Sequence, residues 1–114
     1  MIIKCIEKTY WESVRNLKHW GEAELIKDGF IHNSTIETLP IILNKFSMDK
    51  SFVLLLLDEN KLTSPLIYEM SKKLNLEFPH IYGPINNDAI LEVLPLLRDA
   101  SGNFIENPEF LKYK

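Results

Sequence analysis

The residues SFVLLLLD, at positions 51–58, are seven apolar or small side chains followed by an acid. They show no alternation of polar and apolar residues, which is typical of a strand that is covered on both faces. We therefore predict that residues 51–58 form the central strand of a sheet and the middle of the hydrophobic core.

Other segments on both sides of this run also have strand character. They are rich in β-branched or alternating apolar residues, or are held extended by proline. The predicted strands cover residues 2–6, 30–34, 65–70, 79–85 and 89–97, the last of them ended by Pro95. Residues 89–97 also suit a helix, and we favour the strand.

Two helices are predicted in the first half of the chain. Thr9 and Glu12 have the spacing of a capping box, which predicts a helix over residues 10–19 with Trp11, Val14, Leu17 and Lys18 on one face. Residues 19–29 lose this period, so we expect a connecting segment that Leu25 and Ile26 fix to the core.

The second predicted helix starts at one of three candidate N-caps, Ser34, Thr35 or Thr38, and runs to about Met48. Pro40 is compatible only with the first turn of that helix. Many strands with two early helices indicate an α+β fold, in one domain over residues 1–114.

Composition limits the possible partners. The chain has 46% hydrophobic and 25% charged residues, a net charge of −3 and a pI near 5.6. Acids and lysines are mixed along the chain without a basic block, which argues against nucleic-acid binding. Cys5 is the single cysteine, and the N-terminal stretch is not long and apolar, so we expect a cytoplasmic protein without a membrane anchor.

Two short segments suggest a binding site. Side chains alternate between faces in an extended chain, so GFIHNS places Phe30, His32 and Ser34 on one side, and EFPHIYG does the same for Phe78, His80 and Tyr82. If the two segments form facing walls of a cleft, their rings and imidazoles suit a flat polar ring or a sugar hydroxyl. Half-buried histidines bonded to backbone carbonyls explain the same pattern.

These motifs carry a resemblance to a known family. GFIHNS, the YE of LIYEM and FPHIYGPI, in this order, resemble the Domain of Unknown Function 952 family from the first strand to about Leu96. The resemblance implies an ADP-ribosyltransferase-like fold, similar also to the RNA 2′-phosphotransferases, with small antiparallel or mixed sheets that form a dinucleotide cleft beside two helices. NAD is the cofactor that it suggests, and it brings no established activity.

The resemblance also implies roles for individual residues. Lys4 stands where many similar proteins carry a histidine, and as an ammonium it can donate to a ribose or pyrophosphate oxygen. His32, Ser34 and Tyr82 are the other predicted binding residues, and Glu69 and His80 are the predicted catalytic ones. Cleavage of a nicotinamide–ribose bond develops positive charge on the sugar, which a carboxylate such as Glu69 stabilises. An ordinary surface glutamate explains Glu69 equally well.

Two further types of site are not expected. His19, His32 and His80 do not have a local metal-ligand spacing such as i, i+4, so the sequence predicts no metal site. Cys5 lies on a predicted strand without a neighbouring histidine, so we interpret it as a buried structural residue.

The leading hypothesis is an ADP-ribosyl or phosphoryl-type transferase with a nucleotide-binding cleft. The alternatives are a small-ligand-binding module without catalysis, and a protein-interaction domain that uses Trp20 or the C-terminal Phe104 and Phe110.

Overall fold

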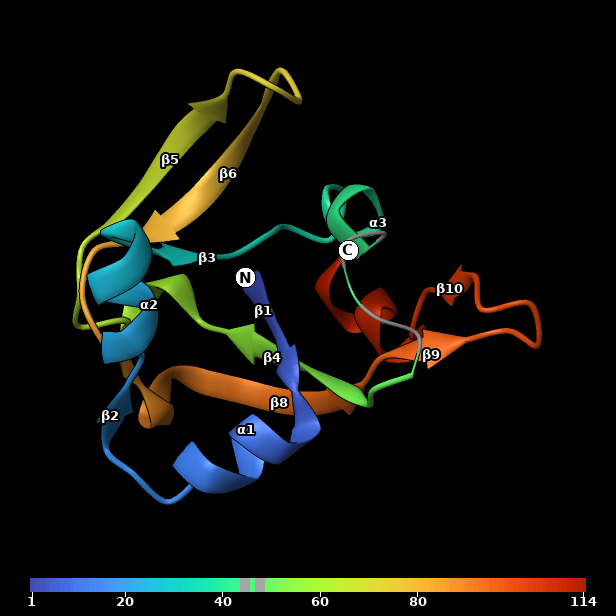
Figure 1. Cartoon of the computed structure of the whole chain (residues 1–114), viewed down its shortest axis with the longest axis horizontal. Coiled ribbons are helices and arrows are strands. Elements are labelled where there is room, and N and C mark those ends of the chain that lie inside the picture. Colours follow the sequence, from blue (N-terminus) through green and yellow to red (C-terminus); the bar gives the residue numbers. More distant parts are fainter. Residues whose placement is uncertain (44–45, 47–48) are drawn as a thin grey trace.

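The computed structural model describes residues 1–43, 46 and 49–114 (Figure 1). The strands in this part of the chain are Ile2–Glu7 (β1), His19–Trp20 (β2), Ile31–His32 (β3), Phe52–Leu57 (β4), Leu66–Ser71 (β5), Leu76–Ile81 (β6), Ile85–Asn86 (β7), Ile90–Pro95 (β8), Leu97–Arg98 (β9) and Phe104–Ile105 (β10). The α-helices are Lys8–Val14 (α1), Glu22–Asp28 (α2) and Leu39–Ile42 (α3), and 3-10 helices cover Glu59–Lys61, Asn87–Ala89 and Pro108–Tyr113.

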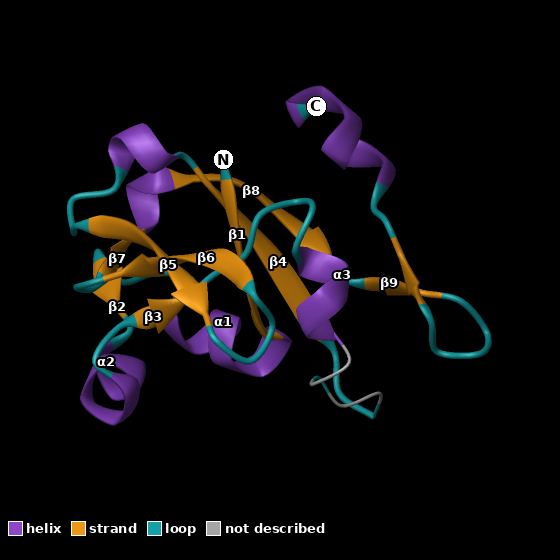
Figure 2. Ribbon diagram, turned by 90° about the horizontal axis from the view of Figure 1, so that it is seen from above, coloured by secondary structure: helices purple, strands orange, loops and turns teal. Residues whose placement is uncertain are grey.

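The strands form small antiparallel sheets, which confirms the α+β prediction. One sheet has the order β1-β4-β8 and another the order β3-β6-β5, while β2 pairs with β7 and β9 with β10. Figure 2 shows β1, β4 and β8 side by side, with α1 against the sheet. The two three-stranded sheets are joined by a bridge between Ile3 and Ser34.

The central strand lies where the sequence predicts it. β4 pairs with β1 on one side and with β8 on the other. Its side chains alternate between two hydrophobic clusters, with Leu55 and Leu57 in the first cluster and Leu54 and Leu56 in the second. All four leucines are fully buried, so β4 is covered on both faces because both faces of its sheet carry a core.

Different elements of the fold pack against the two hydrophobic clusters. The first is closed by Val14 of α1 and by Ile31 and Ile81, which come from the β3-β6-β5 sheet. The second is closed by Leu39 of α3 and by Phe110 of the C-terminal 3-10 helix. The first cluster therefore holds the two main sheets together.

The first predicted helix is shorter than expected. α1 begins at Lys8 and ends at Val14, and its N-cap residue, Glu7, makes no capping hydrogen bond through its side chain, so the predicted capping box of Thr9 and Glu12 is wrong. Leu17 lies beyond the helix and is 50% exposed. The helix stops early because His19–Trp20 must extend to pair with β7.

Residues 19–29 are not the connecting segment that we expected, because they contain β2 and the seven-residue helix α2. Gly21 and Gly29 flank α2 with φ values of 114° and 82°, a conformation that costs glycine little. Leu25 packs against the first cluster as predicted. Ile26 is 86% exposed, so its predicted contact with the core is wrong.

The second predicted helix is observed as the four-residue helix α3, with Thr38 as its N-cap residue and Pro40 in its first turn. It ends at Ile42 and Phe46 lies in a bend, so a continuous helix to about Met48 is wrong, while Met48 itself lies outside the described residues. The predicted strands near residues 65–70 and 89–97 are confirmed as β5 and β8, and the second does end at Pro95. In the part of the chain that is described, no helix has the length and apolar character needed to cross a membrane.

The buried position of β4 gives a direct test of the fold. Replacing Leu55 by Asp should abolish cooperative folding, because an unpaired charge in this core costs more than the roughly 5–15 kcal/mol that stabilises a domain. Circular dichroism and denaturant unfolding measure the effect. Leu91, on the edge strand β8 and 41% exposed, provides the control, since Leu91→Asp should leave a folded protein. A soluble, cooperatively unfolding Leu55→Asp protein would contradict the assignment.

Candidate functional site: a cleft along the open edge of β1

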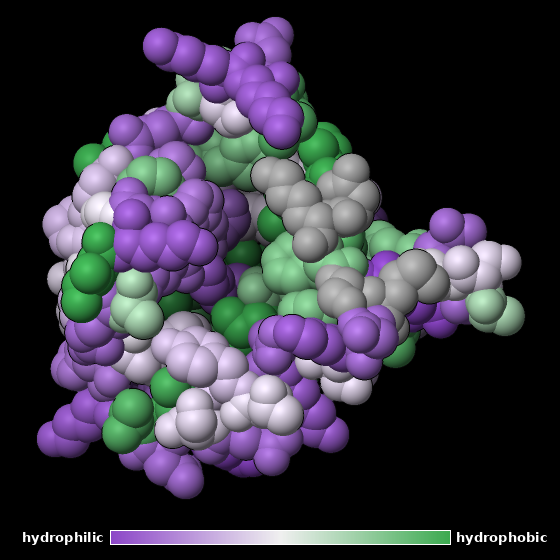
Figure 3. Space-filling view, in the orientation of Figure 1, coloured by the Kyte–Doolittle hydropathy of each residue, from purple (hydrophilic) through white to green (hydrophobic). Residues whose placement is uncertain are grey.

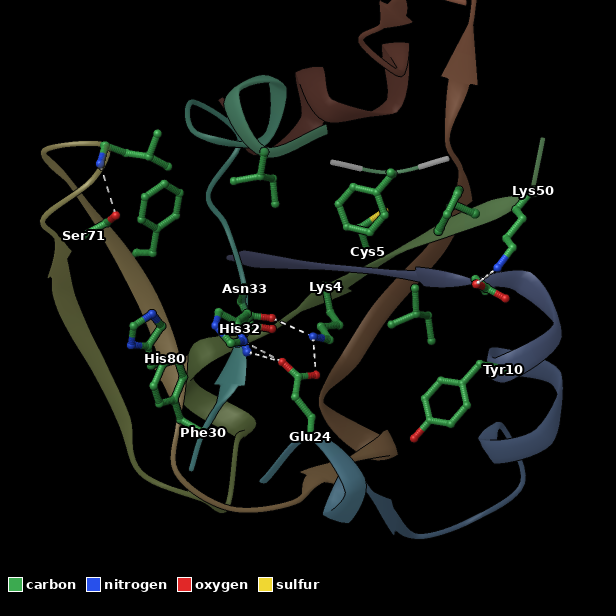
Figure 4. Close-up of a pocket in the computed structure, with 17 residues that line it drawn as sticks. Lys4, Cys5, Tyr10, Glu24, Phe30, His32, Asn33, Lys50, Ser71 and His80 are labelled. Carbon is green, nitrogen blue, oxygen red and sulfur yellow. Dashed lines mark hydrogen bonds and ion pairs between the residues drawn. The ribbon is translucent and has the colours of Figure 1, made fainter. Parts of the chain in front are cut away.

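The molecule contains a cavity of about 1090 Å³ between the two main sheets. Figure 3 shows this face of the molecule hollowed near its centre, with apolar side chains at the bottom of the hollow. Four consecutive residues of β1, Lys4 to Glu7, line the cavity. Consecutive side chains point to opposite faces of a sheet, so the cavity runs along the edge of β1 rather than over one face, as Figure 4 also shows.

Among the described residues, the edge of β1 that faces the cavity is paired only at Ile3. The Ile3 amide donates to the Ser34 carbonyl at 2.7 Å, and the Ser34 amide donates to the Ile3 carbonyl at 2.9 Å. Backbone groups of successive residues point alternately to the two sides of an antiparallel strand, so the amide and carbonyl of Cys5 point away from β4, as those of Ile3 do. Within the described residues no hydrogen bond ends on these Cys5 groups. With respect to the described part of the chain, the cavity wall therefore offers one free donor and one free acceptor.

A buried lysine lies next to this edge. Lys4 Nζ donates to Glu24 Oε1 at 2.7 Å and to the His32 carbonyl at 2.8 Å, and Lys4 is only 7% exposed. The other oxygen of Glu24 accepts from the His32 amide at 2.7 Å and lies 2.8 Å from His32 Nδ1. A single carboxylate on α2 thus joins β1 to β3 (Figure 4).

The pKa values of Glu24 and Lys4 depend on each other. Burial raises the pKa of Glu24, but the hydrogen bond from His32 and the charge of Lys4 outweigh it and lower that pKa to about 2. Burial lowers the pKa of Lys4, and the neighbouring Glu24 opposes this effect. Two of the three ammonium hydrogens of Lys4 are used by Glu24 and His32, which leaves one for a ligand.

Four aromatic rings gather beside Lys4 on one face of the β3-β6-β5 sheet. The ring of Phe30 stacks on that of His80, with centroids 3.9 Å apart and an interplanar angle of 18°. Phe30 also lies 4.6 Å from the ring of His32 and 5.6 Å from that of Tyr82. The alternation within both motifs is therefore confirmed for these side chains, and it forms a ring cluster at the cavity.

The predicted geometry of the two motifs is wrong in one respect. They do not form facing walls, because β3 pairs directly with β6 and His32 is the cross-strand partner of His80. The opposite wall of the cleft is the edge of β1. The extended segment 30–34 crosses from the β3-β6-β5 sheet to the β1-β4-β8 sheet. Its residues Ile31 and His32 pair with β6, and Ser34 pairs with Ile3 of β1.

Glu69 holds two members of the ring cluster. Its Oε1 lies 2.8 Å from His80 Nδ1 and accepts a hydrogen bond from the Tyr82 hydroxyl. The bond from Tyr82, followed by that from His80, lowers the pKa of Glu69. Glu69 and Tyr82 are not among the residues that line the cavity, whereas His80 is. Glu69 therefore contacts the cavity through His80.

The remaining predicted site residues lie in different environments. Ser34 is fully buried and does not line the cavity, and its Oγ has no hydrogen-bond partner among the residues that the structure describes. Burial raises the pKa of the Cys5 thiol to about 12, so this cysteine is not a thiolate at neutral pH. Trp20 and Phe110 are 2% and 1% exposed and belong to the core, so neither forms an open partner surface.

Two residues that line the cavity, Glu24 and Asn33, are not among the site residues predicted from the sequence. The sequence prediction places Glu24 in a connecting segment, although the two flanking glycines, the acids of the first turn and Lys27 in the last turn are typical of a short helix. Asn33 is 4% exposed and lines the cavity. Its Nδ2 donates to the Ile31 and Pro79 carbonyls, and its Oδ1 has no partner within the described residues. Two carbonyl partners fix the orientation of this amide, so Oδ1 is a further unused acceptor.

The chain belongs to the family described as "Protein of unknown function (DUF952)", whose model matches residues 5–93. No curated protein matches the chain significantly. Among solved structures, the crystal structure of protein CC0527 from Caulobacter crescentus is similar, with a TM-score of 0.77 and 27% identity over 91% of this chain and 92% of that chain. The solution structure of CC0527 has a TM-score of 0.73 and 26% identity over 99% and 95% of the two chains.

The Glu24 interactions predict a loss of stability in acid. The pKa of Glu24 is about 2 in the folded protein against an ordinary value of 4.5, so its contribution is complete above about pH 4.5 and is lost as the pH falls towards 2. The shift corresponds to a contribution on the order of 3 kcal/mol to the free energy of unfolding. Urea unfolding between pH 7 and pH 2.5 measures it.

Replacing Glu24 by Gln should destabilise the protein at pH 7 and flatten the pH dependence in this window. Glu12, an exposed residue of α1, provides the matched control, and Glu12→Gln should behave like the wild type. An equal pH dependence in the Glu24→Gln and wild-type proteins would show that Glu24 is not held as described.

Proposed function

We propose that the cleft binds a nucleotide or dinucleotide, with NAD as the first candidate, and that the protein is an ADP-ribosyl or phosphoryl-type transferase. The observation that carries the proposal is the unpaired Cys5 backbone in a cavity that also has stacked rings and a buried ammonium. A volume of about 1090 Å³ is at the upper end of small-molecule sites, which suits a ligand with more than one ring.

The free groups of β1 match a carboxamide. A primary amide such as that of nicotinamide has one acceptor oxygen and a donor nitrogen, so it can pair with the Cys5 amide and carbonyl as a neighbouring strand would. The ring that carries this amide would lie in the cavity near Phe30 and His80, where flat apolar surface is available. The free hydrogen of Lys4 and Oδ1 of Asn33 would bind polar groups further along the ligand.

The proposed catalytic group that contacts the ligand is His80. Its position depends on Glu69, whose ionised carboxylate accepts from Nδ1 and keeps negative charge near a sugar that becomes cationic. Lys4 and His32 would bind the ligand beside it. Ser34 and Tyr82 remain predictions as binding residues, and the contacts described above give them less direct support.

The transferase assignment also rests on the ADP-ribosyltransferase-like fold that the sequence motifs suggest. That fold has a cleft between two small sheets, and the β1-β4-β8 and β3-β6-β5 sheets border the cavity of this protein. The second candidate is a small-ligand-binding module without turnover. It is favoured by the position of Glu69, which does not line the cavity and whose Oε1 binds both His80 and Tyr82, so that this carboxylate orients neighbouring side chains.

Ligand binding can be tested by thermal shift with NAD, ADP-ribose, nicotinamide and 2′-phosphorylated nucleotides. Binding to the folded state alone stabilises it by about 2.7 kcal/mol at a hundredfold excess over Kd, which raises Tm measurably. No shift with any of these compounds would contradict the proposal.

Turnover separates the two candidates. If a ligand binds and is converted, Glu69→Gln should lower kcat at least roughly tenfold while ligand affinity changes little, because only the transition state carries the developing charge. Glu77→Gln, at an exposed position in the same hairpin, is the control and should retain activity. Ligand binding without any turnover in the wild type would support the binding module.

A further inference from the structure

We propose that His32 and His80 together bind a divalent transition-metal ion such as Zn²⁺ through their Nε2 atoms. This inference does not rest on the proposed nucleotide ligand, but it uses the same two histidines, which would then contact such a ligand through the bound ion. It begins with the register of the sheet, which makes the two histidines direct cross-strand partners of β3 and β6 although 48 positions separate them in the sequence. A local spacing such as i, i+4 is not needed when strand pairing brings two imidazoles together.

Both imidazoles are held at Nδ1 by a carboxylate. Glu24 Oε2 lies 2.8 Å from Nδ1 of His32, and Glu69 Oε1 lies 2.8 Å from Nδ1 of His80. Ionised carboxylates only accept hydrogen bonds, so each ring carries a proton on Nδ1, and a neutral ring keeps a lone pair on Nε2. Among the described residues, no hydrogen bond ends on either Nε2. A carboxylate behind a histidine is the arrangement that orients metal-binding imidazoles in proteins.

The separation of the two rings is suitable for one shared ion. Zn–N bonds are about 2.0–2.1 Å long, so two imidazoles on one ion have ring centres roughly 5–6 Å apart. The centroids of His32 and His80 are 5.7 Å apart with an interplanar angle of 65°. Phe30 stacks on the face of the His80 ring, which leaves the ring edge with Nε2 available. Both histidines line the cavity (Figure 4), so the remaining coordination positions would be open to water or to a ligand.

The local charge favours a cation. Glu24, Glu69 and Asp28 lie next to the two imidazoles, with Asp28 Oδ2 3.8 Å from His32 Nδ1. Lys4 is the ammonium that opposes them, and its Nζ is already paired with Glu24. Three carboxylates against one ammonium leave two negative charges beside the imidazole pair.

A second grouping of ligand atoms is less suitable. One carboxylate oxygen of each of Glu24 and Asp28 and one ring nitrogen of His32 lie within 4.8 Å of one another. Glu24, however, already accepts from Lys4 with one oxygen and from His32 with the other. An ion there would have to displace these bonds and lie next to an ammonium, so Glu24 serves better as the partner that orients His32.

The test is a calorimetric titration of the tag-free protein with Zn²⁺, and with Co²⁺ for its absorption spectrum. We expect one ion per chain, at least roughly tenfold weaker binding in His32→Ala and in His80→Ala, and a loss of about tenfold to a hundredfold in Glu69→Gln. His19 is exposed on β2, and His19→Ala is the matched control that should bind like the wild type.

A measurement on the unmodified chain covers the case in which a variant does not fold. In ¹⁵N NMR spectra of the imidazoles, Zn²⁺ should shift the Nε2 signals of His32 and His80 and leave those of His19 unchanged. Absence of Zn²⁺ binding, equal loss of binding in His19→Ala, or a shift of only one of the two Nε2 signals would overturn the proposal.

Discussion

The unequal pairing of the two edges of β1 is the constraint on which the site depends. One edge pairs with β4 along the whole strand, whereas the other has a single partner within residues 1–43, 46 and 49–114, the bridge from Ile3 to Ser34. The same bridge brings the β3-β6-β5 sheet next to β1. The pairing does not continue to Cys5, whose backbone faces the cavity. Unpaired strand edges are usually covered or protected in folded proteins, so an open edge inside a cavity is a reason to expect a ligand there.

Lys4 links this constraint to the charges of the site. It occupies a β1 position between Ile2 and Ile6, which both belong to the first core cluster, and an unpaired ammonium there would be costly. Glu24 provides the counter-charge, and α2 must lie against β1 and β3 for its carboxylate to reach both. The interactions that neutralise a buried lysine therefore also fix the orientation of His32. A similar carboxylate, Glu69, fixes His80 from the next strand.

The parts predicted from the sequence are those with a local signal. The apolar run 51–58 predicted β4, and alternation within GFIHNS and EFPHIYG predicted that Phe30 and His32, and Phe78 and His80, share faces. The capping residues Thr9 and Glu12 predicted the start of α1 wrongly because the helix begins directly after β1 with Glu7 as its N-cap residue. Its end was predicted too late because His19 and Trp20 are extended and pair with β7. Strand register has no local signal, so neither the pairing of His32 with His80 nor the role of Glu24 could be derived from spacing along the chain.

The most direct test of the open β1 edge follows the backbone amides of β1 by NMR during titration with nicotinamide. Before addition, hydrogen exchange should be slow for Lys4 and Ile6, whose amides point towards β4, and faster for Cys5. On addition, we predict that the Cys5 amide signal shifts and that its exchange slows. A Cys5 amide that is as protected as its neighbours without ligand, or that does not respond to nicotinamide while other residues do, would contradict the account.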